Sequence, residues 1–350
     1  MEGSQASRLG LTQTRMEAGD LLDARGHLIA RGYATSEVRK YARGAVKAWP
    51  LRTKEWDYYC VLTGRYGLAL TVADNDYLGF LGVTWLDFER RAFTSVDVLS
   101  PFPLGGMGLP ESADAGDVEQ EHPKLSIAYR HVPGGRELSV SAPIFGAGKG
   151  LEGNLFLEQP PMDRMVIATP FAGAPRSFYY NQKINCLRAR GSVSIGGQSF
   201  AFEPGSAFGV LDWGRGAWTY DNTWCWASAS GIAEGRLFGF NVGYGFGDTS
   251  AATENMLFVD GVAHKLTDVE FHLPDGAPDS APWRFTSSDN RFELTFDPIV
   301  DRASNTDIGL VKSDQHQVFG RYNGRVVLDD GSALKVENLI GFAERVHNRW

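Results

Sequence analysis

The sequence predicts an all-β protein made of two antiparallel β-barrels in tandem, preceded by a short helical segment. Most of the chain divides into short runs of β-branched and aromatic residues, separated by Gly, Pro, Asn and Asp. The aromatic content is 12% and there are 41 glycines, which suits strands joined by tight turns. The strand-like runs fall into two evenly spaced groups on either side of residues 205–210, which favours two closed or nearly closed barrels.

The first part of the chain carries the clearest helical pattern. Ser36 could cap a short basic helix over Ser36–Ala48, so residues 1–48 are predicted to form an N-terminal extension with a short helix. The first barrel is expected to span residues 49–206. Residues 101–123 are rich in Gly, Pro and acidic residues and predict a long exposed loop that could cover a barrel mouth. The strand candidates are Asp57–Thr63, Tyr66–Ala73, Thr94–Leu99, Leu125–Tyr129, Glu137–Ala142, Leu151–Leu157, Met165–Ala168 and Lys183–Val193.

The second barrel is expected to span residues 207–350. Asp260-Gly261, Asn323-Gly324 and Asp330-Gly331 are strong signals for tight turns between its strands. The strand candidates are Tyr220–Ser230, Arg236–Phe246, Asn255–Val259, Val262–Leu266, Val269–Leu273, Trp283–Ser287, Phe292–Phe296, Gln315–Tyr322, Arg325–Leu328 and Leu334–Val346.

Composition and charge exclude several classes of protein. The net charge of -8 argues against nucleic-acid binding, which needs a basic surface. No run of about 18 apolar residues is present, so no membrane span is expected. The first 21 residues lack the apolar core of a secretory signal, and the three cysteines are too few and too far apart for a disulfide framework or a zinc site. We therefore expect a cytoplasmic protein, and the sequence does not indicate its oligomeric state.

A tryptophan-rich segment, Leu211–Trp226, is the strongest indication of a binding site. It contains four of the nine tryptophans, mixed with Asp, Arg, Asn and Tyr rather than with the aliphatic residues of a strand core. Such a mixture is typical of a small-molecule cavity. The alternative is that the indoles simply fill a small barrel.

The strand after this segment alternates between aromatic residues and glycines. Phe238, Phe240, Val242, Tyr244 and Phe246 share one face, and four glycines with Asn241 share the other, which leaves a trough. The turn near Ile232–Glu234 joins the two strands as a hairpin. An odd register would place Trp224 and Trp226 over the trough, and an even register would crowd them against Phe240 and Tyr244. Available volume favours the odd register.

Several ionisable residues are candidates for acid–base chemistry near these indoles. Asp212 and Arg215 flank Trp213 at the entrance to the second barrel, where a charge needs a partner or a function; a structural ion pair between the two is the alternative. Glu254 could be a general acid or base across the cavity mouth from Asp212, unless it lies in a solvated turn. Glu344 and its neighbour Arg345 project to opposite faces of the closing strand, so one of them should point inward. An inward Glu344 would be a further candidate acid.

Other motifs are weaker. The run Gly243–Asp248 resembles a phosphate-binding loop only loosely, because neither a helix nor a Lys-Ser/Thr pair follows it. The seven histidines are scattered, which argues against a metal site. No Gly-x-Ser-x-Gly motif is present, which argues against a serine hydrolase.

The order of these features resembles the superfamily that includes carotenoid 1,2-hydratases, tocopherol cyclase and AttH-like proteins. The segment 207–214, Ala-Phe-Gly-Val-Leu-Asp-Trp-Gly, followed by Trp224-Cys225-Trp226, looks like that superfamily's Asp-x-x-Trp-Gly entry into a second barrel, with shorter spacing. Val259-Asp260-Gly261 resembles the hairpin that follows it. The segments 320–326 and 339–342 resemble the closing strands. In detail the chain looks closest to an uncharacterised bacterial domain-of-unknown-function family within that group, most distinctively over residues 239–255.

The resemblance implies two lipocalin-like barrels and an activity on hydrophobic molecules. Relatives catalyse hydration, cyclisation or cycloaddition with acids and aromatic residues that line the barrels. The resemblance covers most of residues 50–350, with its motifs from about residue 207 onward, and it supports the fold more directly than any one reaction.

The sequence-based hypothesis is an enzyme that needs no cofactor and acts on a hydrophobic or polycyclic small molecule by acid-assisted hydration, cyclisation or isomerisation. Asp212 would donate the proton, Arg215 would tune Asp212 or hold an anionic group, and Glu254 would be a second acid or base. Two alternatives stay open: a lipocalin-type binding protein without chemistry, and a carbohydrate-active hydrolase that uses Asp212 and Glu254 as paired carboxylates. The predicted ligand-binding residues are Trp213, Trp218, Tyr220, Asn222, Trp224, Trp226, Asn241 and Tyr244, with no metal ligand.

Overall fold

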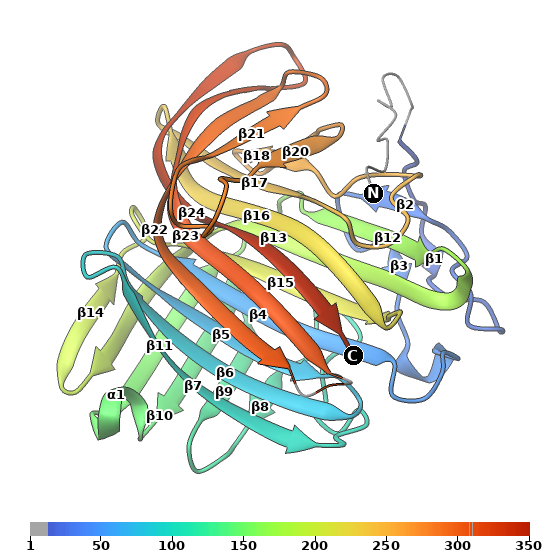
Figure 1. Ribbon diagram of the computed structural model, residues 1–350, viewed down its shortest axis with the longest axis horizontal. Coiled ribbons are helices and arrows are strands. Elements are labelled where there is room, and N and C mark those ends of the chain that lie inside the picture. Colours follow the sequence, from blue (N-terminus) through green and yellow to red (C-terminus); the bar gives the residue numbers. More distant parts are fainter. Residues whose placement is uncertain (1–12, 308, 310) are drawn as a thin grey trace.

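The computed structural model describes residues 13–307, 309 and 311–350, and its regular structure is almost entirely β-strand (Figure 1). Two large antiparallel sheets contain nearly all of the strands. Sheet 1 has a continuous path of strands in the order β7 (Ala92–Pro101), β6 (Leu78–Asp87), β5 (Tyr66–Asp74), β4 (Thr53–Leu62), β15 (Phe208–Ala217), β13 (Ala174–Ile195), β11 (Leu151–Glu158), β10 (Gly135–Ala142), β9 (Ser126–Val132) and β8 (Val118–Gln120).

Three further strands attach to sheet 1. β12 (Met165–Phe171) and β14 (Gln198–Phe202) pair with the two halves of β13, and β2 (Gly32–Ala34) pairs with β12. Sheet 2 has the order β19 (Val262–Lys265), β18 (Met256–Val259), β17 (Arg236–Tyr244), β16 (Asp221–Ala233), β24 (Ala333–Arg349), β23 (Lys312–Val327), β22 (Phe292–Asp307), β21 (Trp283–Ser287) and β20 (Val269–His272).

The N-terminal region contains less helix than the sequence predicts. β1 (Gly19–Asp20) and β3 (Arg39–Lys40) form a small parallel sheet, and the only helical turn near the predicted Ser36–Ala48 helix is the 3-10 turn Arg43–Ala45. Tertiary contacts explain the difference. The Tyr180 hydroxyl donates to the Arg39 carbonyl, and the buried Tyr41 donates its hydroxyl hydrogen to Glu55, which holds this segment extended against sheet 1.

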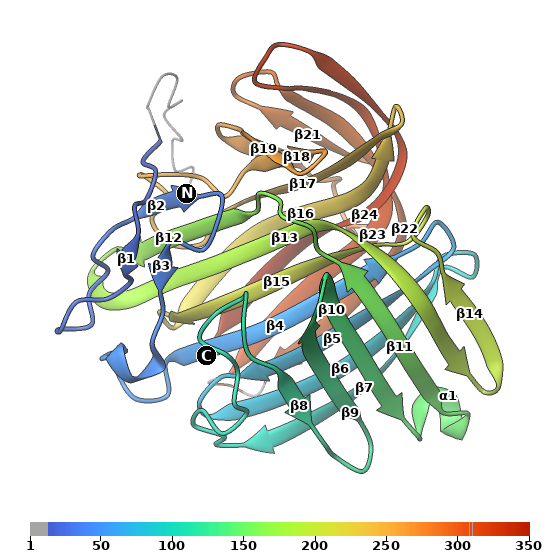
Figure 2. The same cartoon turned by 180° about the vertical axis from the view of Figure 1, so that it is seen from behind.

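Each sheet curls around its own apolar core. In sheet 1 the two outermost strands, β7 and β8, are consecutive in the chain, and α1 (Phe145–Gly148) contacts β7. In sheet 2 the strands β17 and β20 approach each other in the same way. The result is two half-barrels, which confirms the predicted all-β class with two tandem lipocalin-like barrels. Figure 2 shows β8–β11 of the first half-barrel in front of the second.

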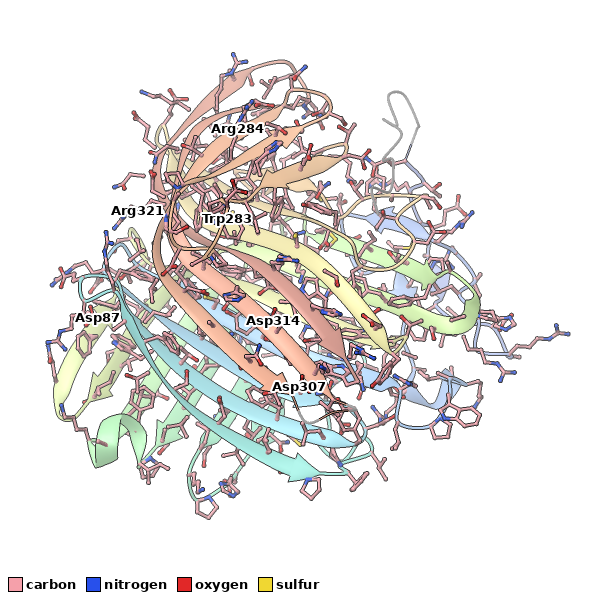
Figure 3. The ribbon with its side chains drawn as sticks, viewed as in Figure 1. Asp87, Trp283, Arg284, Asp307, Asp314 and Arg321 are labelled. Carbon is pink, nitrogen blue, oxygen red and sulfur yellow. The ribbon has the colours of Figure 1, made fainter. Side chains whose placement is uncertain are left out.

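The long strands of sheet 2 extend beyond its half-barrel and lie over sheet 1. Figure 3 labels Trp283 at the curled end of sheet 2, and Asp307 and Asp314 on the part that overlies sheet 1. Two apolar clusters join the sheets. One contains Tyr58, Phe88 and Phe342, and the other contains Tyr179, Trp218 and Phe246. These clusters flank the region in which the buried polar side chains of both sheets meet.

The boundary between the two sheets lies later in the chain than the predicted boundary between residues 206 and 207. β15, which begins at Phe208, sits between β4 and β13 at the centre of sheet 1, and the chain enters sheet 2 only with β16. All ten residues of β15 are buried, because one face covers the first half-barrel and the other meets sheet 2. The tryptophan-rich segment therefore connects the two sheets.

Candidate active site

The two faces of β15 separate the sequence-predicted residues. Asp212 and Gly214 point toward sheet 2, whereas Trp213 and Arg215 point into the first half-barrel. The expected Asp212–Arg215 ion pair is therefore wrong, because residues three apart on a strand lie on opposite faces. Asp212 instead pairs with Lys183 of β13, with 2.7 Å between Oδ2 and Nζ.

Lys183 is held at the junction of the sheets by two interactions. Its ammonium group bonds Asp212 and lies 3.6 Å from the centre of the Trp226 ring, on the opposing sheet. Such a cation over an indole face is favourable, and more so when water is excluded. Asn181 completes the arrangement by donating from Nδ2 to Asp212 Oδ1 at 2.6 Å. The Asp212 carboxylate is thus fixed in position by one ion pair and one hydrogen bond.

The hairpin β16–β17 has the predicted odd register. Trp226 pairs with Gly243 and Ser228 with Asn241, so the indoles and the glycines share the face toward sheet 1. The glycines make room for other groups. A Cβ at Gly243 would lie 2.6 Å from Glu254 Oε1, and one at Gly239 would lie 2.6 Å from Cys186 Sγ. The trough is therefore filled by Glu254 and by a bulge of sheet 1.

Glu254 is part of the site and does not lie in a solvated turn. Asn241 accepts a hydrogen bond from Trp226 Nε1 at 2.6 Å and donates to the Glu254 side chain at 3.2 Å. Burial raises the pKa of Glu254, and the opposing effects of Lys183 and of the hydrogen bond from Asn241 are smaller. Lys265 flanks the same loop, and burial lowers its pKa to about 7.

Glu344 is the third carboxyl group of the site, and it is the residue of the Glu344–Arg345 pair that points inward. It lies on β24, where it accepts hydrogen bonds from Trp224 Nε1 at 2.9 Å and from Gln317 Nε2 at 3.1 Å. Gln317 in turn accepts from the Tyr58 hydroxyl of sheet 1 at 3.2 Å. Burial raises the pKa of Glu344 to about 7, so the protonated and ionised forms coexist near neutral pH.

Strand register explains why these residues meet. Lys183, Asp212 and Tyr58 are cross-strand neighbours in one row of sheet 1, and Trp226, Glu344 and Gln317 form a corresponding row in sheet 2. The three carboxyl groups keep a small exposed fraction, 7% for Asp212, 8% for Glu254 and 9% for Glu344, so they are not fully sealed in the core. We call Asp212, Glu254, Glu344 and Lys183 the inter-sheet site.

An aromatic wall borders the inter-sheet site and consists of Trp56, Tyr179, Trp218, Trp224 and Phe246. The Trp56 ring stacks on Tyr179 with 6.2 Å between ring centres, and Trp218 meets the rings of both Trp56 and Trp224 edge-on. Gly214 makes this possible, because a Cβ there would lie 1.9 Å from the Trp56 ring. The faces of such aromatic rings carry negative partial charge and can stabilise a nearby positive charge.

Arg215 belongs to a separate buried cluster in the first half-barrel. Its guanidinium bonds Asp57 at 2.9 Å, the carbonyls of Pro110, Trp56 and Gly214, and lies 4.1 Å from the centre of the Trp213 ring. Pro110 belongs to the predicted 101–123 loop, which is tied down over this half-barrel rather than freely exposed.

The other predicted ligand-binding residues lie outside the inter-sheet site. Tyr244 packs against Phe271 in the core of sheet 2, on the face opposite Asn241. Asn222 donates to the Thr219 carbonyl and closes the turn before β16. The Tyr220 ring lies between the guanidinium groups of Arg52 and Arg349. The sequence reasoning missed Lys183, Asn181, Gln317 and Tyr58. The available signal was the polar alternation Asn181, Lys183, Asn185 on one face of a strand that was expected in the first barrel.

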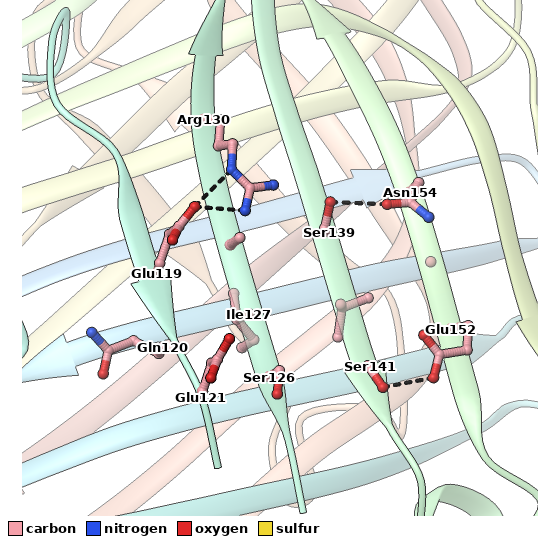
Figure 4. Close-up of a pocket in the computed structure, with 13 residues that line it drawn as sticks. Glu119, Gln120, Glu121, Ser126, Ile127, Arg130, Ser139, Ser141, Glu152 and Asn154 are labelled. Atoms are coloured by element: carbon pink, nitrogen blue, oxygen red, sulfur yellow. Dashed lines mark hydrogen bonds and ion pairs between the residues drawn. The ribbon is translucent and has the colours of Figure 1, made fainter. Parts of the chain in front are cut away.

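A shallow groove on the outer face of sheet 1 is distinct from the inter-sheet site (Figure 4). It crosses β8–β11, and its polar groups largely satisfy one another: Glu119 pairs with Arg130, Ser139 donates to Asn154, and Ser141 donates to Glu152. These paired surface groups give no indication of a ligand.

Residues 13–307, 309 and 311–350 contain no group of three or more His, Cys, Asp or Glu side chains placed to hold a metal ion. In the same residues no helix has the length and apolar character needed to cross a bilayer. The three cysteines are buried and unpaired with one another.

The fold and the site together define a protein of the tandem lipocalin-like class with a polar site between its sheets. The chain belongs to the family described as domain of unknown function DUF2804, whose model matches residues 12–350. This confirms the resemblance drawn from the sequence motifs. None of the curated proteins matches the chain.

Solved structures share the fold at low sequence identity. An AttH-like protein from Nitrosomonas europaea is 14% identical, with a TM-score of 0.52 over 84% of this chain and 92% of that chain. The protein CghA in complex with Sch210972 is 12% identical, with a TM-score of 0.50 over 95% of this chain and 97% of that chain. Kievitone hydratase from Nectria haematococca is 10% identical, with a TM-score of 0.49 over 90% of this chain and 96% of that chain.

Proposed function

We propose that this protein is an acid–base enzyme that acts on a hydrophobic small molecule in the inter-sheet site, by hydration, cyclisation or isomerisation. The observation that carries the proposal is the meeting of three carboxyl groups around one lysine beside the aromatic wall. A structural ion pair needs one carboxylate for one lysine. The two additional buried carboxyl groups, Glu254 and Glu344, form no ion pair within 4.0 Å among the described residues, although Lys265 lies near enough to Glu254 to lower its pKa. Buried carboxyl groups with raised pKa values are typical of a catalytic site.

Glu344 is the proposed proton donor, in place of Asp212. Its pKa of about 7 leaves a large protonated fraction at neutral pH, and it bonds Trp224 of the aromatic wall. Protonation of a carbon–carbon double bond would leave a carbocation, which the indoles and the ionised Asp212 would stabilise.

Glu254 is the proposed proton acceptor. In hydration, water would bond to the cationic carbon and give a proton to Glu254, so that alkene and water become an alcohol. In isomerisation or cyclisation, the cation would lose its own proton to the same group. Asn241 holds the Glu254 side chain through the hydrogen bond at 3.2 Å, and Trp226 holds Asn241.

Native mass spectrometry of the protein purified from its own host tests this proposal. We expect the wild type and Glu344→Gln to retain different forms of one apolar ligand, because the variant cannot donate the proton. The two masses should differ by one water molecule for hydration, and chromatography should separate isomers of equal mass. Glu337→Gln, an exposed glutamate on the same strand, is the matched control and should resemble the wild type.

Two results would contradict the enzyme proposal. If Glu344→Gln and Asp212→Asn retain the same chemical form as the wild type, the protein is a binding protein. If Trp224→Ala leaves the retained ligand unchanged in amount, the ligand does not lie against the aromatic wall.

Once a substrate is identified, the pH profile gives a second test. Activity should fall above a pH of about 7 as Glu344 ionises. The negative charge of Asp212 raises the pKa of Glu344, so Asp212→Asn should move this fall toward lower pH. An unmoved profile would exclude Glu344 as the titrating group.

A further inference from the structure

A patch of exposed apolar side chains lies at one end of sheet 1, away from the inter-sheet site. We call it the apolar rim; it consists of Trp49, Leu51, Phe102 and Leu104, which are 80%, 40%, 61% and 59% exposed. Ten large hydrophobic side chains are exposed among the described residues, and four of them are concentrated in these two short segments. A group of this kind on a protein surface indicates an interaction site.

The two segments are held next to each other by the turn between β5 and β6. Lys54 donates to the carbonyls of Leu51 and Asn75, and Thr53 N donates to the Asp76 side chain. On the other side of the same turn, Leu104 N donates to the Asp76 carbonyl, and Phe102 N to that of Tyr77. The apolar side chains are therefore presented together on a fixed support.

Backbone conformation indicates that these residues are not there for the fold. Leu51, Phe102 and Leu104 have φ angles of 66°, 50° and 53°, in the left-handed region that bulky residues disfavour. Glycine or asparagine would suit these positions better. Because these three side chains stay 40%, 61% and 59% exposed, burial recovers only part of this cost, and a strained, exposed apolar residue is a reason to look for a function.

The charge next to the apolar rim identifies the partner. Residues 39–54 contain six basic residues and no acidic one, but Arg39 and Lys54 are buried and Arg43 pairs with Glu55 and Asp76. Lys40 and Lys47 are exposed, and the segment Phe102–Gly108 carries no charge at all. Proteins bind the surface of an anionic bilayer through three kinds of residue. Tryptophan lies at the boundary between headgroups and acyl chains, aliphatic and aromatic side chains enter the apolar region, and lysines contact the negatively charged headgroups.

We propose that the apolar rim docks this protein on the surface of an anionic lipid bilayer. Trp49, Phe102 and the two leucines would enter the headgroup region, and Lys40 and Lys47 would contact lipid phosphates. The acidic remainder of the protein would be repelled, so the molecule would bind in one orientation. The proposal is independent of the proposed function, because none of these residues lies in the inter-sheet site.

Cosedimentation of the full chain with vesicles tests the proposal. We expect the protein to sediment with vesicles of equal parts phosphatidylcholine and phosphatidylglycerol, much less with phosphatidylcholine alone, and less as salt is added. Trp49→Ala/Phe102→Ala should lower the bound fraction about tenfold, and Lys47→Glu should lower it severalfold. Ile144→Ala and Lys149→Glu change an exposed apolar and an exposed basic residue at α1, on the opposite side of sheet 1, and should bind like the wild type.

A single variant separates docking from folding. Leu104→Gly suits the left-handed backbone, so it should keep the wild-type melting temperature while it weakens vesicle binding. A large loss of thermal stability would show that Leu104 serves the fold and would contradict the argument. The proposal is also wrong if the wild-type protein does not sediment with the vesicles, or if the variants sediment as much as the wild type does. A third contradicting result would be a dimer in analytical ultracentrifugation that Trp49→Ala/Phe102→Ala dissociates, because the apolar rim would then bind a second copy of the chain.

Discussion

Two buried ion pairs each have one residue on the strand β15, but the two pairs lie on opposite faces of that strand and have different surroundings. Asp57–Arg215 lies inside the first half-barrel, where the guanidinium uses its donors on one carboxylate and three backbone carbonyls. Asp212–Lys183 lies between the sheets, where one ammonium group serves a region with three carboxyl groups. Both pairs are almost completely buried, so burial alone does not distinguish them.

The two ion pairs differ in their hydrogen-bond donors and in the number of carboxyl groups around the cation. Arg215 donates to Asp57 and to three backbone carbonyls, as a structural network requires, although burial also raises the pKa of Asp57 and the Trp213 Nε1 has no hydrogen-bond partner among the described residues. In the inter-sheet site, burial raises the pKa values of Glu254 and Glu344, and the charge of the nearby Asp212 adds a smaller rise to each. Burying ionisable groups with raised pKa values costs stability, and such groups are concentrated at functional sites.

The largest effect is expected from Arg215→Met. This change leaves the buried Asp57 without the cation that opposes the burial-raised pKa of its carboxyl group, and it leaves the Pro110 carbonyl without its donor. We expect the free energy of unfolding to fall by about 3–5 kcal/mol in urea titrations. Arg65→Ala, which removes an exposed pair with Glu89, is the control and should leave the midpoint unchanged. If Arg215→Met is as stable as the wild type, the Asp57–Arg215 pair does not stabilise the fold and its contrast with Asp212–Lys183 is wrong.

Glu344→Gln should produce the next largest effect, and it should depend on pH. The folded protein binds this proton more tightly than the unfolded chain, since burial raises the pKa from 4.5 to about 7. The wild type therefore loses stability as pH rises through this interval, by at most about 3 kcal/mol, and the variant does not. In urea titrations between these pH values, the free energy of unfolding of the variant should rise relative to that of the wild type as the pH rises. Glu337→Gln should follow the wild type, and parallel curves for Glu344→Gln would refute a raised pKa.

Gly243→Ala should have the smallest of the three effects. The added Cβ would lie 2.6 Å from Glu254 Oε1 and 2.8 Å from the Cys225 carbonyl, so Glu254 must move. We expect a loss of about 1–2 kcal/mol in stability, together with altered ligand retention in native mass spectrometry. Gly205→Ala, where a Cβ meets nothing within 4 Å, is the matched control. If the two variants behave alike, the glycine trough does not position Glu254.

Much of the fold was predictable because strands carry local signals. Asp260-Gly261 forms the predicted turn between β18 and β19, and the odd register of β16–β17 follows from the volumes of indoles and glycines. The predicted helix at Ser36–Ala48 was wrong, because a weak helical pattern gives way to the contacts that Tyr41 and Arg39 make with sheet 1. The position of β15 in sheet 1 was missed, since its partners β4 and β13 are far away in sequence.

The candidate site was predicted only in part. The candidates Asp212, Glu254, Trp224, Trp226 and Asn241 lie in one region together with the inward Glu344, and their role as a site stays a prediction. Lys183 could not be recognised as the partner of Asp212, because a single lysine in a long strand has no local signature. The local proximity of Arg215 to Asp212 suggested an ion pair that the alternation of β15 forbids.

The sequence by itself indicated many of the strands, the turn at Asp260-Gly261, and the aromatic and glycine-bearing faces of β16 and β17, because these properties depend on neighbours a few positions away. It indicated no strand over β6 or β15, and the turn predicted at Asn323-Gly324 was wrong, because β23 continues there through a bulge. The tertiary structure alone decided that Asp212 faces Lys183, that Asp57 faces Arg215, and that Glu254 and Glu344 share one buried region. Those contacts join strands that lie far apart in the chain, and their charges acquire unusual pKa values only when the packing of two sheets removes water.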